Sequence, residues 1–148
     1  MFRSLVGSLF VVGVAVAAPV PKAKTKEPSL DGRWITTERS HSGGAITTPW
    51  VWVIEGEKFT AHSAKDGGVG NPNFPGATTT LTRPDPIKAD EYDYTYTAPN
   101  TTLVYRGRVK WDGEEWLFAF GPANGDRPAE VKAGDGVYFH RFKRIADK

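Results

Sequence analysis

The sequence predicts an all-β fold, an antiparallel up-and-down barrel of about eight short strands. Three observations favour this fold class. Short segments that alternate apolar and polar residues recur along the chain, and this period of two is typical of strands with one buried face. Two of the connections contain the glycine of a tight turn, which joins neighbouring antiparallel strands. Beyond the N-terminal segment no stretch has a convincing 3.6-residue period, so we expect little helix.

A meander of this size either folds into a two-sheet sandwich or closes into a barrel. Closure removes the exposed strand edges. About eight strands leave an interior that holds side chains or one small ligand. We therefore expect the barrel.

Length and composition indicate one globular domain. The 148 residues are 39% apolar and include five Trp, eight Phe and five Tyr, which is enough to build a hydrophobic core. The formal net charge of +2 is too small to indicate a nucleic-acid partner. Cysteine is absent, which excludes disulfides, thiolate metal sites and a cysteine nucleophile.

Residues 1–18 have the features of a secretory signal peptide. Arg3 supplies the positive charge, residues 5–14 the apolar segment, and residues 15–17 the small side chains of a cleavage site. The alternative is an uncleaved anchor, but the apolar run is shorter than the roughly 20 residues that span a bilayer. We therefore expect an extracytoplasmic protein, periplasmic or secreted, with no membrane span after cleavage.

The segment that follows, residues 19–29, is rich in Pro and Lys and has almost nothing to bury. This composition predicts an extended tether. The barrel domain then covers residues 30–148. Its first predicted strand is residues 33–38, and a Gly/Ser/Thr loop follows at residues 40–48.

The first predicted hairpin has its turn at Gly56-Glu57. This turn pairs Ile54 with Phe59, whereas a turn one residue earlier would place Ile54 opposite Glu57. The side chains on the predicted inner face are all apolar: Trp50, Trp52, Ile54, Phe59 and Ala61.

The middle of the chain contains a long loop and two further strands. Residues 64–76 are rich in Gly, Asn and Pro, which predicts the loop, and residues 78–83 form a threonine-rich strand. The next strand, residues 91–97, alternates Tyr92, Tyr94 and Tyr96 with polar residues. These tyrosines either point inward with their hydroxyls near an open end or form an outer patch for a partner.

The second predicted hairpin is the most informative stretch, residues 102–121. Asp112-Gly113 indicates a two-residue turn with positive φ at both positions. This turn pairs Val109 with Trp116 and Gly107 with Phe118, and glycine leaves room for the ring. The bulky side chains then share one face: Tyr105, Val109, Trp116, Phe118 and Phe120. Residues 122–135 form a loop, and residues 137–144 the closing strand.

Several motifs in this order resemble a known family. They are Leu30-Asp-Gly-Arg-Trp34, the Gly56-Glu57 hairpin running into Phe59, the segment Tyr105-Arg-Gly-Arg-Val-Lys-Trp-Asp-Gly113, and Arg127-Pro128 before a final strand rich in Tyr, Phe and Arg. Together they are similar to the lipocalin-like domain family of unknown function that is abundant in planctomycete-type bacteria. The resemblance covers residues 30–144. It departs at Val109, where the family usually has an aromatic residue, and in the long loop at residues 64–76.

This resemblance implies an exported, lipocalin-like up-and-down barrel and no established catalytic residues. The ionisable residues themselves form no catalytic motif. His41, His62 and His140 lack the spacing of a ligand pair, and we interpret them as scattered surface or edge histidines. No Gly-x-Ser-x-Gly motif is present. We therefore predict no catalytic residues, no metal site, no cofactor and no enzymatic activity.

The aromatic side chains are the candidate ligand-binding residues. In one interpretation they line a mouth or small apolar pocket, and in the other they simply fill the barrel. Arg127, in a loop near the expected mouth, either bonds to backbone carbonyls or meets an anionic ligand. The candidate site residues are Trp34, Trp50, Trp52, Tyr94, Tyr105, Trp116, Phe118 and Arg127.

Three hypotheses of function follow. The first is a monomeric, exported, non-enzymatic lipocalin-like barrel that binds a small hydrophobic or amphipathic ligand or a surface partner such as an envelope component. The second is a structural envelope-associated module with a filled core and no ligand. The third is an extracytoplasmic hydrolase.

Overall fold

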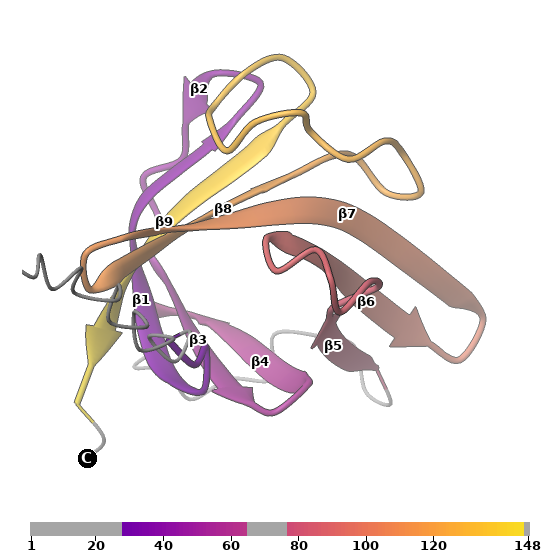
Figure 1. Cartoon of the computed structure of the whole chain (residues 1–148), viewed down its shortest axis with the longest axis horizontal. Helices are drawn as coiled ribbons and strands as arrows, with labels where there is room; N and C mark the ends of the chain where they lie inside the picture. Colours follow the sequence, from indigo (N-terminus) through magenta and orange to yellow (C-terminus); the bar gives the residue numbers. More distant parts are fainter. Residues whose placement is uncertain (1–27, 65–76, 147–148) are drawn as a thin grey trace, which may run out of the picture.

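The computed structural model describes residues 28–64 and 77–146, which form one continuous antiparallel sheet (Figure 1). The predicted signal peptide, most of the predicted tether and most of the predicted loop at residues 64–76 lie outside these described residues. The strands are β1 (Gly32–His41), β2 (Gly44–Ala45), β3 (Trp50–Glu55), β4 (Lys58–Ser63), β5 (Thr78–Thr82), β6 (Glu91–Ala98), β7 (Thr101–Asp112), β8 (Glu115–Phe120) and β9 (Tyr138–Ile145).

The sheet closes into a barrel because β1 pairs with both β3 and β9. Every other barrel strand pairs with its neighbour in sequence, so eight strands form the barrel, and β2 pairs only with the end of β1. The described residues contain no α-helix. The predicted all-β, up-and-down barrel is confirmed. No helix in residues 28–64 and 77–146 is long and apolar enough to cross a membrane.

The barrel has two different ends. We call base the end with the β3–β4 and β7–β8 turns, and mouth the opposite end, where β1 ends at His41 and β9 begins at Tyr138. The β4–β5 pairing is the shortest between neighbouring strands of the barrel: only Lys58 and Thr80 are paired. The Thr79 hydroxyl adds a bond to the Phe59 carbonyl.

The first hairpin has the predicted register. Glu55 pairs with Lys58 and Ile54 with Phe59, so Gly56-Glu57 is the turn. Gly56 has a φ of 62°, in the left-handed region that glycine adopts without a steric penalty. A glycine at the first central position is typical of a type II′ turn, whose twist matches that of the flanking strands.

The predicted register of the second hairpin is wrong by one residue at the turn. Asp112 pairs with Glu115, so the turn residues are Gly113-Glu114 and not Asp112-Gly113. Only Gly113 has positive φ, 64°, so this turn repeats the Gly-Glu turn of the first hairpin. The like charges of Asp112 and Glu115 are compensated by Arg141, whose Nη1 donates to both carboxylates at 2.8 and 3.0 Å.

The inward-facing residues of this hairpin are nevertheless those predicted. The shift moves each cross-strand partner by two positions, which preserves the face on which every side chain lies. Val109 is opposite Phe118, and Gly107 is opposite Phe120. Gly107 does leave room for a ring: a Cβ there would lie 2.8 Å from the Ala119 carbonyl oxygen and overlap Phe118.

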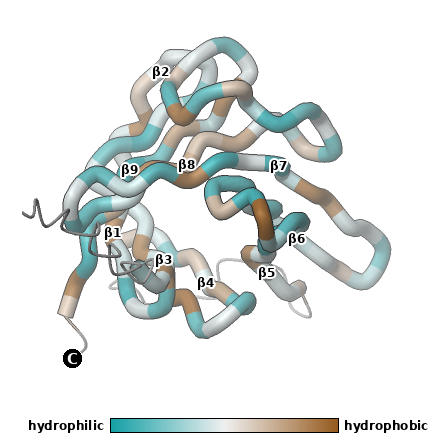
Figure 2. Tube along the Cα trace, in the orientation of Figure 1, coloured by the Kyte–Doolittle hydropathy of each residue, from teal (hydrophilic) through white to brown (hydrophobic). Residues whose placement is uncertain are grey.

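The base half of the barrel is filled by large side chains. Hydrophobic and hydrophilic positions are interspersed along the strands (Figure 2), and the largest fully buried side chains are Trp34, Ile54, Trp116, Phe118 and Phe142. The rings of Trp116 and Phe142 stack with centroids 4.1 Å apart. Burial of each such side chain contributes about 2 to 3 kcal/mol.

A second apolar cluster covers the outside of β8 and β9. Leu117, Ala119 and Phe139 point outward from the barrel but are buried, because Val131 and Val137 of the β8–β9 connection pack on them. Strand β8 is therefore buried on both faces, which explains why its sequence does not alternate.

Candidate functional site

A cavity of about 200 Å³ opens at the mouth and reaches to the middle of the barrel. Every barrel strand except β5 contributes to its wall, which consists of Arg39, Trp50, Trp52, Ala61, Tyr94, Tyr105, Phe120, Tyr138 and His140. Six of these nine side chains are aromatic rings of Trp, Tyr or Phe. Ala61 is the small residue among them, and a larger side chain at this position would occupy the cavity.

The aromatic rings form packed pairs that fix the cavity walls. Tyr94 stacks on Tyr105 with centroids 5.0 Å apart, and Phe120 stacks on Tyr138 at 5.1 Å. Burial raises the pKa of Tyr94 to about 12 and also raises the pKa of Tyr105. Both hydroxyls are therefore protonated at neutral pH and act as uncharged hydrogen-bonding groups.

His140 lies inside the barrel, and its predicted location at the surface or at an edge is wrong. Its side chain points inward from β9 and the residue is only 5% exposed. Its ring meets Trp52 edge-on with centroids 5.9 Å apart. Nδ1 is buried and has no hydrogen-bond partner among the described residues. Burial, with a smaller contribution from the charge of Arg39, lowers the pKa of His140 to about 3, so the imidazole is neutral at pH 7.

Arg39 carries the positive charge of the cavity wall. Its Nη1 donates to the Thr48 carbonyl at 2.7 Å, and its guanidinium lies over the Trp50 ring, 5.1 Å from the centroid. Its Nε is buried and has no partner within the described part of the chain. Burial lowers the pKa of Arg39 from its usual value, because it removes the charged guanidinium from part of its water.

A β-bulge points Arg39 into the cavity. The β1–β9 register shifts between Thr36 and Glu38, and an extra residue in one strand reverses the side on which later residues point. Arg39 is consequently opposite the inward-facing His140. Without the bulge, the period of two that starts at Trp34 would place Arg39 on the outside.

The eight sequence-predicted residues fall into three groups. Trp50, Trp52, Tyr94 and Tyr105 converge on the mouth cavity. Trp34, Trp116 and Phe118 lie in the filled base half, with at most 1% of each residue exposed.

The eighth residue, Arg127, is not at the mouth. It lies on the outer surface, where Nη2 is 2.8 Å from Asp93 Oδ1 and Nε is 3.4 Å from Glu91. It also donates to the carbonyls of Tyr92 and Gly107. Of its two predicted roles, the structure shows the bonds to backbone carbonyls.

Five residues of the cavity wall were absent from the predicted site: Arg39, Ala61, Phe120, Tyr138 and His140. The alternation of Tyr138, His140 and Phe142 in β9 could have placed His140 inside. The outward-facing Phe139 obscures that signal, because it is equally apolar. Nothing in the sequence marks the bulge that turns Arg39 inward.

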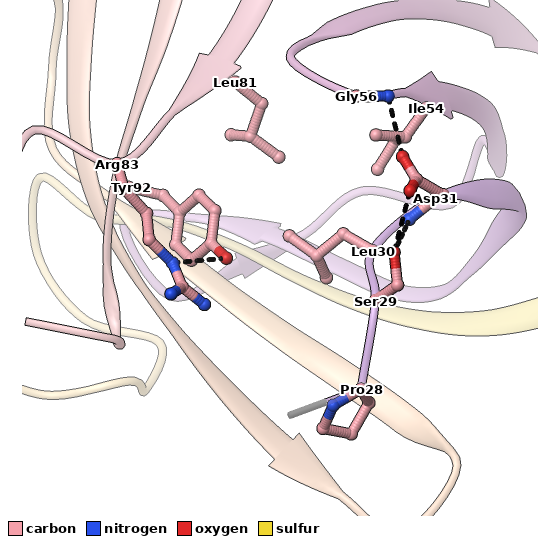
Figure 3. A pocket seen from close by; sticks show the side chains of 9 residues that line it. All are labelled: Pro28, Ser29, Leu30, Asp31, Ile54, Gly56, Leu81, Arg83 and Tyr92. Atoms are coloured by element: carbon pink, nitrogen blue, oxygen red, sulfur yellow. Dashed lines mark hydrogen bonds between the residues drawn. The ribbon is translucent and has the colours of Figure 1, made fainter. Parts of the chain in front are cut away.

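A second pocket, of about 270 Å³, lies at the base, where the chain enters β1 (Figure 3). Leu30, Ile54 and Leu81 face it. The Asp31 carboxylate accepts bonds from the Gly56 amide at 2.7 Å and the Ser29 hydroxyl at 2.9 Å, and these bonds lower its pKa. The polar groups of this pocket therefore hydrogen-bond to one another, whereas the mouth cavity has two buried nitrogens, Arg39 Nε and His140 Nδ1, without a partner among the described residues.

No three His, Cys, Asp or Glu side chains in residues 28–64 and 77–146 gather closely enough to hold a metal ion. Comparisons of the chain with family models, with curated proteins and with solved structures found no match in any of the three.

Proposed function

We propose that this chain is an exported, non-enzymatic, lipocalin-like barrel that binds a small hydrophobic or amphipathic molecule in its mouth cavity. The observation that carries the proposal is the contrast between the two halves of the barrel. In the base half large rings fill the barrel interior, and the base pocket lies where the chain enters β1, whereas rings of the same kind surround an open volume inside the mouth. An aromatic, concave site with a few polar groups is the usual form of a small-molecule site.

The cavity volume supports a small ligand. At about 200 Å³ it lies below the roughly 300 to 1,000 Å³ of sites for drug-sized ligands. A molecule with one ring and a short polar group is the appropriate size. Among the described residues the cavity wall contains no carboxylate and no Ser, Thr or Cys nucleophile, which supports binding over hydrolysis. Export and the family resemblance remain predictions from the sequence.

Native mass spectrometry of the mature protein, purified from its own host, tests the proposal. We expect a small molecule to co-purify with the wild-type chain. The matched variant is Ala61→Leu, which places a larger side chain in the cavity. It should lose the bound mass while its melting temperature stays the same or rises, because the cavity is filled. A bare wild-type chain, together with no binding of small aromatic compounds, would contradict the proposal.

The structural, ligand-free module remains the second candidate. The filled base and the small size of the mouth cavity favour it. It predicts that Ala61→Leu changes stability alone and that the wild type carries no bound mass. The same pair of proteins therefore separates the two functions.

A further inference from the structure

We infer that the mouth cavity selects an anionic ligand, a small ring-bearing carboxylate whose charged group meets Arg39 and whose ring packs against Trp50 and Trp52. This inference rests on the proposed function, since it names the chemical class of the molecule that the cavity binds. It goes beyond that function because a purely hydrophobic site needs no charged group. Its basis is a pair of polar side chains, Arg39 and His140, each with a buried nitrogen that has no partner among the described residues, in an otherwise apolar and aromatic wall.

Arg39 has no ion pair within the described part of the chain, unlike three other partly buried arginines of the barrel. Arg33 also has a buried Nε without a partner among the described residues, but only Arg39 lines the cavity. Arg108, Arg127 and Arg141 each have a nitrogen no farther than 2.8 Å from a carboxylate oxygen. Arg39 has no ion pair among the described residues, and its one hydrogen bond goes to the Thr48 carbonyl. A guanidinium has five N–H donors. Arg39 therefore keeps donors that no described residue accepts from, the buried Nε among them.

His140 is the second unpartnered group in the same wall. It is opposite Arg39 in the β1–β9 register, and its buried Nδ1 has no partner in the described part of the chain. A buried polar group without a hydrogen bond destabilises the folded protein. Two such groups side by side in a cavity indicate that a ligand supplies the missing bonds. A neutral imidazole also offers an N–H donor without adding a second positive charge.

The geometry suits a carboxylate. The planar guanidinium matches two carboxylate oxygens in a fork, which gives both direction and strength to the contact. The cavity of about 200 Å³ has room for one ring beside that group. The cavity wall includes the rings of Trp50, Trp52, Tyr94 and Tyr105, and aromatic rings pack well in offset and edge-to-face contacts.

The test compares two compounds of the same shape, phenylacetate and phenylacetamide, which differ in charge. Binding is followed by the NMR signals of the indole N–H groups of Trp50 and Trp52, assigned with Trp50→Phe and Trp52→Phe. We expect both signals to shift and phenylacetate to bind about tenfold more tightly, because a hydrogen bond between two charged groups is stronger than one between a charged and a neutral group.

Two arginine variants assign this preference to one side chain. Arg39→Gln should bring the affinity ratio of the two compounds close to one. Arg106→Gln is the matched control: it changes the net charge equally but removes an exposed side chain that donates to the Gly125 carbonyl, so the ratio should stay at the wild-type value. Arg39→Lys, the substitute if Arg39→Gln does not fold, should retain part of the preference because it keeps the charge and loses the fork.

The outcomes separate this inference from the proposed function. Equal affinity for the two compounds, or a preference that survives in Arg39→Gln, would overturn the anion inference and leave small-molecule binding intact. If neither compound shifts the two tryptophan signals and no mass co-purifies with the chain, both proposals fail together.

Discussion

Acidification should destabilise this protein well above the pH at which its carboxylates are protonated, and His140 is the reason. The imidazole lies among Trp52, Phe120 and Phe142, and burial lowers its pKa from 6.5 to about 3. The unfolded chain therefore binds a proton near pH 6.5 that the folded chain does not bind until about pH 3. The contribution of neutral His140 to the free energy of unfolding is fully present above pH 6.5, and it is lost as the pH falls from 6.5 towards 3.

The size of the effect follows from proton linkage. Each pH unit between the two pKa values costs about 1.4 kcal/mol, so the change from pH 6.5 to pH 4.5 costs about 2 to 3 kcal/mol. Carboxylates add little to this pH dependence of the free energy of unfolding between pH 6.5 and 4.5. Partners hold the pKa values of Asp31, Asp90 and Glu130 below their usual values, and such groups lose their contribution only at lower pH.

Urea unfolding at a series of pH values measures this dependence. For a slope of about 1 to 3 kcal/mol per molar urea, the wild-type midpoint should fall by about 1 to 2 M between pH 6.5 and 4.5. His140→Phe should remove most of this fall, because phenylalanine suits the aromatic surroundings and does not titrate. His41→Gln, at an exposed position, should keep it. Parallel curves for the wild type and His140→Phe would refute a buried, neutral His140.

Substitutions at three further positions test the packing and the second turn. Arg127→Gln should lower the free energy of unfolding by about 2 to 4 kcal/mol, because it removes the ion pairs of Arg127 with the buried carboxylate of Glu91 and with Asp93. A loss below about 1 kcal/mol in urea unfolding would contradict this role. Gly107→Ala should lower the free energy of unfolding by about 1 to 3 kcal/mol and change the near-UV circular dichroism, since the added Cβ overlaps the Phe118 ring. An unchanged spectrum would show that Phe118 does not need the space that glycine leaves. Gly113→Ala should lower the free energy of unfolding by about 1 kcal/mol because φ is 64° there. Gly113→Asn should cost less, since asparagine tolerates positive φ. Equal decreases in the melting temperature of the two variants would argue against this turn geometry.

Local sequence signals were sufficient where one face of a strand is buried and the other is solvated. The Gly56-Glu57 turn and the inner face of β3 and β4 follow from alternation alone, because any other register pairs apolar with charged residues. Alternation does not decide the position of the second turn, because turns at Asp112-Gly113 and at Gly113-Glu114 place the same side chains inside the barrel. The choice between them depends on Arg141, which comes from a distant strand and bonds to Asp112 and Glu115.

The fold class, the inward direction of the large rings and four of the cavity residues were thus determined by the sequence itself, since a period of two and glycine turns act over a few residues. Tertiary structure decided the rest. Closure of β1 on β9 introduces the bulge that turns Arg39 inward beside His140. Docking of the β8–β9 connection buries Phe139 on the outside and hides the alternation of β9. Both depend on contacts between residues far apart in the chain, which no local pattern records.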